Sequence, residues 1–455
     1  MTAPAGSASR SARRRVGVVL AVDFVALSLV VAFSGAAWGW LDGSRPTDAT
    51  ASSPTAGFSG AVATPIGSSS AGPSEVTPSA SRSASPSPVP SATPTPAGGV
   101  WTPAESAPYA LWGAGSTLLN DGRVLVVGGT STASSATAVA RTEVYDPTTG
   151  HWTATTDMLH ARAYAMVVTL KDGSVLAVGG AFGGVPLTSA ERYVPDFGGW
   201  MQAGSMSSPR TQGTITLLAD GRVLVAGGGS VGAPSFAATS SAELYDPATN
   251  TWTVAASMSM PRTLHTATLL NDGEVLVAGG ATSYTGGQGT VTSSAEIYDP
   301  KADAWHTAAS MSTARYIHSA TRLGNGHVLV VGGWAFTTNF DPSLETAEVY
   351  DPASNGWTPT GSMAAGRARF SLVSLNDGRL LAAGGVGPTY HMLATAELWD
   401  PGTGHWQATG SLGAAVMWPA IAVLPDGRTL IAGGALDPRA ARTTSVCAIY
   451  SPPPR

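Results

Sequence analysis

The sequence has 455 residues, of which 12% are charged, and its formal net charge at pH 7 is −5. A mildly acidic chain argues against nucleic-acid binding, which usually requires a basic face or stripe. The only cysteine is Cys447, which excludes an intrachain disulfide and a cysteine-rich zinc site, and the eight histidines lack metal-ligand spacing. We therefore expect no metal and no other cofactor.

The N-terminal region predicts export from the cytoplasm. Residues 1–15 end in the basic stretch RSARRR, and residues 16–41 are apolar except for Asp23. The 18 uncharged residues from Phe24 to Leu41 reach about the lower limit for a membrane-spanning helix. The preceding arginines predict a cytoplasmic N-terminus, with the rest of the chain outside. Two interpretations stay open: a single-pass signal anchor, or a signal peptide cleaved near the small residues 34–36, which would release a secreted protein.

Residues 42–100 form a linker rich in Ser, Pro, Thr and Ala, such as SASRSASPSPVPSATPTP. This composition offers too little apolar surface to offset the entropy of ordering. We predict a disordered, proline-stiffened stalk that separates the remainder of the chain from the membrane.

A repeat unit occupies residues 101–455. The stretch DGRVLVVGG at 121–129 has close copies ending at Gly180, Gly228, Gly280, Gly333, Gly385 and Gly434, so that seven copies follow one another at spacings of 48 to 53 residues. A second motif follows most copies, as in TEVYDP at 142–147, and a tryptophan comes shortly after it. Such internal periodicity is the signature of a repeat architecture.

Each unit predicts four short antiparallel strands. A polar turn such as Asn-Asp-Gly joins the first strand to the apolar VLVVGG strand, the Glu-x-Tyr strand follows, and Asp-Pro turns into the tryptophan strand. Four strands in about 50 residues is the pattern of a propeller blade. The last unit lacks a tryptophan strand, and Trp101 stands in register before the first unit. We predict a seven-bladed all-β propeller in which residues 100–107 supply the outer strand of the last blade.

These motifs resemble the kelch repeat, and the resemblance covers residues 101–455. The form L-x-D-G-x-V-L-x-x-G-G also resembles the propeller of galactose oxidase. That enzyme's copper site uses two tyrosines and two histidines, with one tyrosine crosslinked to a cysteine. Here the adjacent Tyr390 and His391 lie in a loop after Gly-Gly, and Cys447 lies on the Glu-x-Tyr strand of the last unit. We expect a kelch-type propeller without the copper site.

Two sets of residues are candidates for ligand binding at one mouth of the propeller. Five units carry an arginine in the turn before the first strand: Arg162, Arg210, Arg262, Arg315 and Arg367. Converging guanidinium groups suit carboxylates, sulfates and phosphates, whereas the alternative is that each arginine binds carbonyls of its own turn. The loops after Gly-Gly carry aromatic and histidine side chains that suit a sugar or a peptide, among them Tyr284, Trp334, Tyr390 and His391. The repeated glutamates of the Glu-x-Tyr motif predict one internal hydrogen bond per blade and no catalytic pair.

The sequence favours a monomeric extracellular binding module that recognises a cell-surface polysaccharide, an acidic glycan or a protein at the arginine-lined mouth. The alternatives are a carbohydrate-active enzyme similar to sialate mutarotase and an architectural surface domain. An enzyme would require an acid or base outside the repeat pattern, whereas a binding module would not. No catalytic residue is predicted.

Overall fold

The computed structural model describes residues 98–455, except residue 111 and the segments 132–136, 233–234, 286–287, 336–342 and 438–441. The predicted basic segment 1–15, the apolar segment 16–41 and residues 42–97 of the linker lie outside the described residues. Within the described residues, no helix is long and apolar enough to span a membrane.

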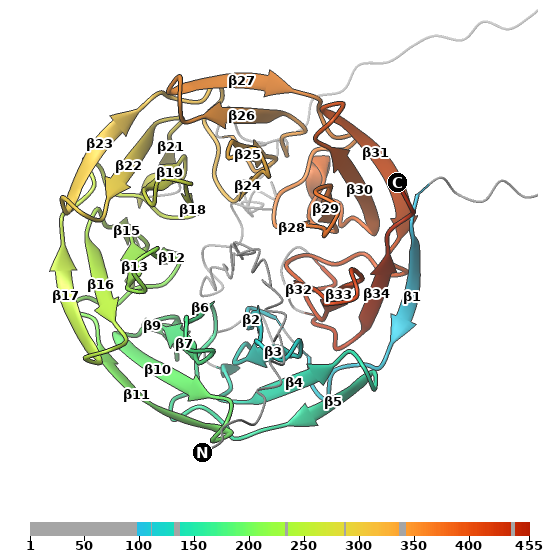
Figure 1. The fold of residues 1–455 in the computed structure, drawn as a ribbon, viewed down its shortest axis with the longest axis horizontal. Coiled ribbons are helices and arrows are strands. Elements are labelled where there is room, and N and C mark those ends of the chain that lie inside the picture. The colour runs from blue at the N-terminus through green and yellow to red at the C-terminus, as the bar shows by residue number, and fades with distance from the viewer. Residues whose placement is uncertain are drawn as a thin grey trace, which may run out of the picture.

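Seven four-stranded antiparallel sheets surround a central axis (Figure 1). Blade 1 contains β2 (Gly115–Leu118), β3 (Val124–Val127), β4 (Thr142–Asp146) and β5 (His151–Ala154). Blade 2 contains β6 (Met166–Thr169), β7 (Val175–Val178), β10 (Ser189–Val194) and β11 (Gly199–Ser205). Blade 3 contains β12 (Thr214–Leu217), β13 (Val223–Ala226), β16 (Ala242–Asp246) and β17 (Thr251–Ala255). The prediction of an all-β propeller with seven four-stranded blades is confirmed.

The remaining blades repeat this plan. Blade 4 contains β18 (Thr266–Leu269), β19 (Val275–Ala278), β22 (Ala295–Asp299) and β23 (Ala304–Ala308). Blade 5 contains β24 (Ser319–Arg322), β25 (Val328–Val331), β26 (Ala347–Asp351) and β27 (Gly356–Thr360). Blade 6 contains β28 (Ser371–Ser374), β29 (Leu380–Ala383), β30 (Thr395–Asp400) and β31 (His405–Ser411). Blade 7 contains β32 (Ala420–Val423), β33 (Thr429–Ala432), β34 (Cys447–Ser451) and β1 (Val100–Ala104).

The two ends of the described chain meet in blade 7. Strand β1 pairs antiparallel with β34, so that Trp101 lies opposite Tyr450 and Ala104 lies opposite Cys447. The ring centroids of Trp101 and Tyr450 are 4.9 Å apart. Blades 1 to 5 place a tryptophan on the Glu-x-Tyr tyrosine in the same way, as Trp252 does on Tyr245. This pairing covers the edge of β34, which would otherwise be open to other strands.

The second strand of each blade is buried along its whole length, as in β3, β13 and β25. A strand covered by neighbouring blades on both faces has no solvent side, which explains why its residues are apolar without alternation. The outer strands are exposed on one face, and their tryptophans tie the blades together. The indole N–H of Trp305, for example, donates to the carbonyl oxygen of Ala256 in the preceding blade at 2.8 Å.

The Gly-Gly pairs stand where two blades approach most closely. Gly279 has φ +65°, and a Cβ placed on it would lie 2.6 Å from the carbonyl oxygen of Arg315 in the next blade. Both the left-handed backbone and the contact require glycine at this position. The glycines therefore serve the join between blades.

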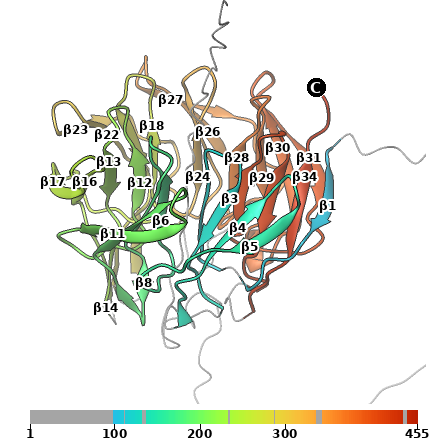
Figure 2. The same ribbon diagram turned by 60° about the horizontal axis from the view of Figure 1, so that its bottom comes forward.

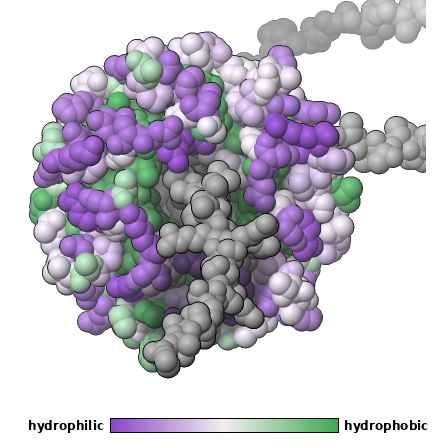
Figure 3. Space-filling view, viewed as in Figure 1, coloured by the Kyte–Doolittle hydropathy of each residue, from purple (hydrophilic) through white to green (hydrophobic). Residues whose placement is uncertain are grey.

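Extra strands project from one mouth of the propeller (Figure 2). The short hairpin of β8 (Ala181–Phe182) and β9 (Val185–Pro186) follows the Gly-Gly pair of blade 2. Blades 3 and 4 each extend a hairpin, and these join into one sheet of β14 (Gly229–Gly232), β15 (Ser235–Ala238), β20 (Ala281–Thr285) and β21 (Gln288–Val291). The face drawn in Figure 3 is mainly hydrophilic, with smaller hydrophobic areas among the polar residues.

Candidate functional site

Two sets of loops form one mouth of the propeller. The turn that enters each first strand forms a β-bridge with the residue that follows Gly-Gly in the same blade. The bridges include Trp112 with Thr130, Tyr316 with Trp334, and Met417 with Ala435. The predicted arginines and the loops after Gly-Gly therefore lie together at this mouth.

The five repeat arginines point into the blades. Their residues are at most 1% exposed. In blade 4, Arg262 Nη1 donates to the carbonyl oxygens of Gly279 and Ser294, both at 3.0 Å, and Nη2 lies 2.9 Å from Glu296 Oε1. The other arginines form the same buried ion pair with the Glu-x-Tyr glutamate of their own blade: Arg162–Glu191, Arg210–Glu243, Arg315–Glu348 and Arg367–Glu397.

These contacts correct the expectation of an arginine-lined mouth. A guanidinium group whose donors face carbonyls and a carboxylate inside the blade is not available to a ligand at the surface. The glutamates complete the arrangement, because the second oxygen accepts a hydrogen bond from the turn backbone, as Glu243 Oε2 does from Ser207 N–H at 2.7 Å. Arg367, Arg262 and their equivalents therefore fix the turn to the sheet.

Blade 1 achieves the same contacts with a different side chain. The hydroxyl of Tyr109 lies 3.5 Å from the carbonyl oxygen of Gly128 and 3.3 Å from that of Arg141. Arg162 Nη1 reaches the equivalent pair of carbonyls in blade 2. Without an arginine partner, the blade 1 glutamate, Glu143, keeps one buried oxygen unbonded, and burial raises its pKa. Glu143 lies on β4, within the blade.

A ring of seven equivalent residues lies two positions beyond the arginine in each unit. All seven have a left-handed backbone, with φ between +47° and +64°: Gly113, Tyr164, Gln212, Leu264, Ile317, Arg369 and Trp418. Backbone hydrogen bonds link neighbours in this ring, including Tyr164 N–H to Gly113 O at 2.7 Å and Trp418 N–H to Arg369 O at 2.9 Å. This conformation is strained for any residue other than glycine, and most for a β-branched one such as Ile317.

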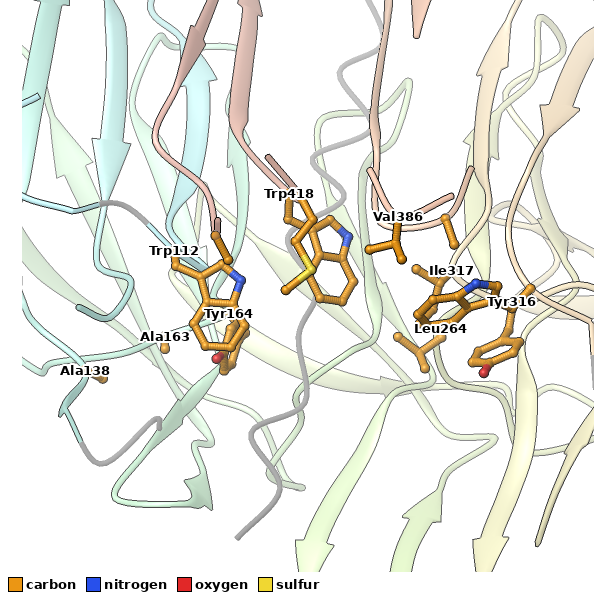
Figure 4. Close-up of a cluster of buried hydrophobic side chains, with 13 residues drawn as sticks. Trp112, Ala138, Ala163, Tyr164, Leu264, Tyr316, Ile317, Val386 and Trp418 are labelled. Carbon is orange, nitrogen blue, oxygen red and sulfur yellow. The ribbon is translucent and has the colours of Figure 1, made fainter. Parts of the chain in front are cut away.

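The ring side chains and their neighbours form a buried cluster at the mouth (Figure 4). We call it the mouth cluster, and its larger members are Trp112, Tyr164, Leu264, Tyr316, Ile317, Trp334, Met417 and Trp418, to which we add Arg369. The rings of Trp112 and Tyr164 meet edge to face, with centroids 5.7 Å apart. Trp334 lies 5.9 Å from Tyr316 and 5.9 Å from Tyr390. The cluster brings together residues from several blades.

Arg369 carries the charge of the mouth cluster. Its guanidinium carbon lies 4.8 Å from the ring centre of Trp334 and 4.6 Å from that of Trp418, so that it is held between the two indoles. The residue is only 6% exposed, and burial lowers its pKa to about 10, against the opposing effect of nearby tyrosines. Among the described residues, no carboxylate lies within salt-bridge distance of it.

Several polar atoms of the mouth cluster and the ring are buried without a hydrogen-bond partner. They are the indole nitrogens of Trp112 and Trp418, the hydroxyl of Tyr164, Nε2 of Gln212 and Nε of Arg369. Other buried unbonded atoms lie within the blades, such as Nε of Arg367 and Nε1 of Trp399. Buried polar groups in native proteins are almost always bonded, so the gathering of five such atoms at the mouth needs an explanation. All five belong to side chains at the mouth, and all five atoms are able to donate a hydrogen bond.

Two histidines lie directly behind the ring. Nε2 of His265 is 3.1 Å from Thr214 Oγ1, and Nε2 of His318 is 3.0 Å from Thr266 Oγ1. Burial lowers the pKa of His265 to about 3 and that of His318 well below its usual value, with the neighbouring arginine as the second cause in each. Both imidazoles are therefore neutral near pH 7 and bind the inner strand of the preceding blade.

The predicted aromatic residues divide between the cluster and its surroundings. Trp334 is buried in the mouth cluster, and Tyr390 packs against it. His391 is exposed on the loop beside them. Tyr284 lies on β20 in the projecting sheet, and its side chain lies outside what the structure describes.

Sequence reasoning missed Arg369, Trp418, Trp112 and Tyr164. A signal was available for Arg369, Trp418 and Tyr164, because the position two beyond the repeat arginine is different in all seven units, but not for Trp112, which lies one position earlier.

The described residues include no group of three or more His, Cys, Asp or Glu side chains placed to hold a metal ion. Cys447 is the one cysteine of the sequence that could form the cysteine–tyrosine crosslink of a copper site. It is buried in blade 7 opposite Ala104. Burial raises the pKa of its thiol to about 11. The residues present do not fit a copper–cysteine–tyrosine centre.

Comparisons with known proteins agree with the fold. The Kelch motif matches residues 116–159, and the Attractin/LZTR1 beta-propeller matches residues 200–341. Alpha-scruin of Limulus polyphemus is 30% identical over 153 residues, which cover 33% of this chain and 16% of alpha-scruin. The F-box protein AFR of Arabidopsis thaliana is 30% identical over 29% of this chain and 34% of its own length. Human kelch-like protein 34 is 30% identical over 32% of this chain and 21% of its own length. The matches thus span well under two thirds of these relatives.

Solved structures show the same architecture. A fungal alcohol oxidase of the AA5 family, in complex with copper, aligns with a TM-score of 0.64 at 20% identity, over 78% of this chain and 76% of the oxidase. YjhT aligns with a TM-score of 0.53 at 14% identity, over 68% of this chain and 99% of YjhT. At these identities the likeness shows the fold alone.

Proposed function

We propose that this chain, a kelch-type β-propeller, is a binding module that recognises its ligand through the mouth cluster. Kelch propellers are generally interaction modules, and the mouth cluster is the place of binding that we propose. The ligand class that we propose is a cell-surface glycan or a protein. The basic residues 10–15 and the apolar segment 16–41 support a further proposal, that the propeller is displayed outside the cell membrane.

One observation carries the proposal: the ring has the same strained conformation in every blade but a different side chain in each. Six of its seven residues are not glycine, although glycine is the residue that tolerates this backbone best. Packing alone does not explain a set that includes Gln212 and Arg369, because Nε2 of Gln212 and Nε of Arg369 are buried and unbonded. A bound ligand would supply the missing partners.

Binding explains the site better than catalysis does. The repeat glutamates are engaged with the arginines, and His265 and His318 are held neutral inside the scaffold. The carboxylate that departs from this pattern, Glu143, lies on β4. A ligand at the mouth cluster would meet aromatic rings, amide and indole donors and one guanidinium group, which is a recognition surface.

The test is a binding screen with variants of the ring. The full-length chain, purified in a mild detergent because of its apolar N-terminal segment, would be applied to an array of cell-surface glycans and proteins. Trp418→Ala removes an aromatic wall of the mouth cluster, and Val254→Ala removes an exposed side chain from the outer strand β17. We expect Trp418→Ala to lose the captured ligand and Val254→Ala to keep it. Equal capture by both variants would place the binding site elsewhere.

A further inference from the structure

Arg369 differs from the repeat arginine two residues before it. Arg367 donates to the carbonyl oxygens of Gly384 and Thr395 and pairs with Glu397 at 2.6 Å. Arg369 has no such set of partners within the described residues. Its Nη1 lies 3.7 Å from the sulfur of Met417, its Nε is unbonded as that of Arg367 is, and its guanidinium group is otherwise in contact with the faces of Trp334 and Trp418.

A buried cation without a counter-charge is unfavourable, because it has lost its hydration and has gained no ion pair. Contact with two indole faces offsets part of this loss, but the faces provide no acceptor for the in-plane N–H groups of the guanidinium, and Nε has no hydrogen-bond partner. These N–H groups form the planar fork that matches a carboxylate. Arg369 is therefore suited to be the cation of an ion pair in which the ligand supplies the carboxylate.

The neighbouring unbonded atoms indicate what else the ligand contains. The indole nitrogens of Trp112 and Trp418 and Nε2 of Gln212 are donors, and the hydroxyl of Tyr164 can donate or accept. A ligand that satisfies these groups is rich in oxygen acceptors around a single negative charge.

The mouth cluster favours a sugar over a peptide. Backbone hydrogen bonds join four neighbouring pairs of the ring, as between Ile317 N–H and Leu264 O at 3.0 Å, and these groups are not available for the main-chain pairing that often binds peptides. The available groups are side-chain donors and aromatic rings. Hydroxyl oxygens accept from such donors, and the C–H faces of a sugar pack on aromatic rings.

We propose that Arg369 binds the carboxylate of a sugar acid, so that the ligand of the mouth cluster is a glycan that contains uronic-acid-type residues. This assignment rests on the proposed function and specifies its ligand. Arg369 provides the fork for the carboxylate, Trp334 and Trp418 hold the guanidinium in place, and Gln212, Tyr164 and Trp112 meet the sugar oxygens.

The test compares one polymer with and without its charge. Calorimetric titration of the full-length chain with oligogalacturonate, with its methyl ester and with oligoglutamate separates the carboxylate, the sugar and the peptide. We expect the acid form to bind at least tenfold more tightly than the ester, and oligoglutamate to bind no better than the ester. This comparison uses the unaltered chain, so it does not depend on the folding of a variant.

Variants then locate the carboxylate. Arg369→Gln should weaken binding of the acid form at least tenfold and leave the ester unchanged, whereas Arg428→Gln, which removes an exposed arginine paired with Asp426, should bind as the unaltered chain does. Equal binding of acid and ester, preference for oligoglutamate, no binding of the acid form, or acid binding that Arg369→Gln retains would each overturn the assignment. If Trp418→Ala still abolished capture of a different ligand from the array, the proposed function would stand and only the sugar-acid assignment would fall.

Discussion

Arg367 and Arg369 are both buried arginines of one turn, and we expect their removal to have different effects on stability. Methionine is the replacement in both variants, because it has a similar length and carries no charge. It leaves the positive φ of residue 369 as strained as before, so backbone strain does not enter the comparison. The two variants therefore report the energetics of the two guanidinium groups.

Arg367→Met leaves Glu397 buried without its cation. Glu397 keeps one hydrogen bond, from Ala364 N–H at 2.7 Å, and the carbonyl oxygens of Gly384 and Thr395 lose the donor Nη1. Removing one partner of a buried ion pair destabilises proteins by about 3–5 kcal/mol. We expect a loss of free energy of unfolding in this range.

Arg369→Met removes a charge that has no counter-charge. Burial lowers the pKa of Arg369 from its ordinary range to about 10, which corresponds to about 3 kcal/mol against the charged form in the folded state. The variant is relieved of this penalty but loses two cation–π contacts, each worth about 1–2 kcal/mol when desolvated. The two effects offset each other, and we expect a change within about 1 kcal/mol.

Urea unfolding followed by tryptophan fluorescence measures both variants beside the unaltered chain. We expect the free energy of unfolding of Arg367→Met to be well below that of the other two proteins. The values for Arg369→Met and the unaltered chain should differ little. If Arg369→Met lost as much free energy of unfolding as Arg367→Met, the contrast between the two arginines would be refuted. Such a loss would mean that Arg369 is stabilised in the free protein by partners equivalent to those of Arg367. Far-UV circular dichroism without urea is the control that each variant retains its sheets.

Three further predictions test other parts of the structure. Gly279→Ala should destabilise the fold by more than about 2 kcal/mol in urea unfolding, because it adds a Cβ 2.6 Å from a carbonyl oxygen to the strain of about 1–2 kcal/mol at positive φ. Gly183→Ala is the control, since it is also at positive φ but has no atom near its Cβ, and it should show the backbone strain alone. The pKa of His265 is lowered to about 3, so its contribution to stability is complete above about pH 6.5 and is lost at about 1.4 kcal/mol per pH unit as the pH falls toward 3. His265→Phe should therefore flatten the pH dependence of the urea midpoint over this range. A midpoint that fell with pH as steeply in His265→Phe as in the unaltered chain would contradict this. Cys447 is buried with a pKa raised to about 11, and it should react with a thiol reagent near pH 8 only when urea unfolds the propeller; rapid labelling of the folded chain would show that blade 7 opens.

The fold was predictable because the same local signals occur in every unit. Gly-Gly, Glu-x-Tyr and the tryptophan each specify a turn or a strand, and their repetition fixes the number of blades. The role of the arginines was predictable in principle as well. Five units contain both the arginine and the glutamate, and the last unit has Val416 and Ala448 in their places, whereas the first unit is an exception with Leu111 and Glu143. Such joint presence and absence indicates a pair within the blade, which the two motifs considered separately do not show.

The mouth cluster was not predictable from the same signals. Nothing in the identities of Leu264, Ile317 or Trp418 indicates a left-handed backbone, which these residue types rarely adopt. The conformation is imposed by the turn between blades and is visible only once the blades are assembled. The direction of a side chain is the second missing quantity, because Arg367 and Arg369 are two residues apart in one turn and yet point into different surroundings.

Repetition within the chain separates scaffold from site in physical terms. A position that serves only the scaffold has the same surroundings in each blade, so one residue type suits all of them, as arginine and glutamate do. The ring position has the same backbone in each blade, and the scaffold alone would be served best by glycine, which Gly113 supplies once. The other six residues each carry a strain of about 1–2 kcal/mol, and Arg369 adds the burial of a charge. Side chains kept at that disadvantage, different in every blade and gathered at one mouth, support the proposal of an asymmetric ligand that meets each blade differently.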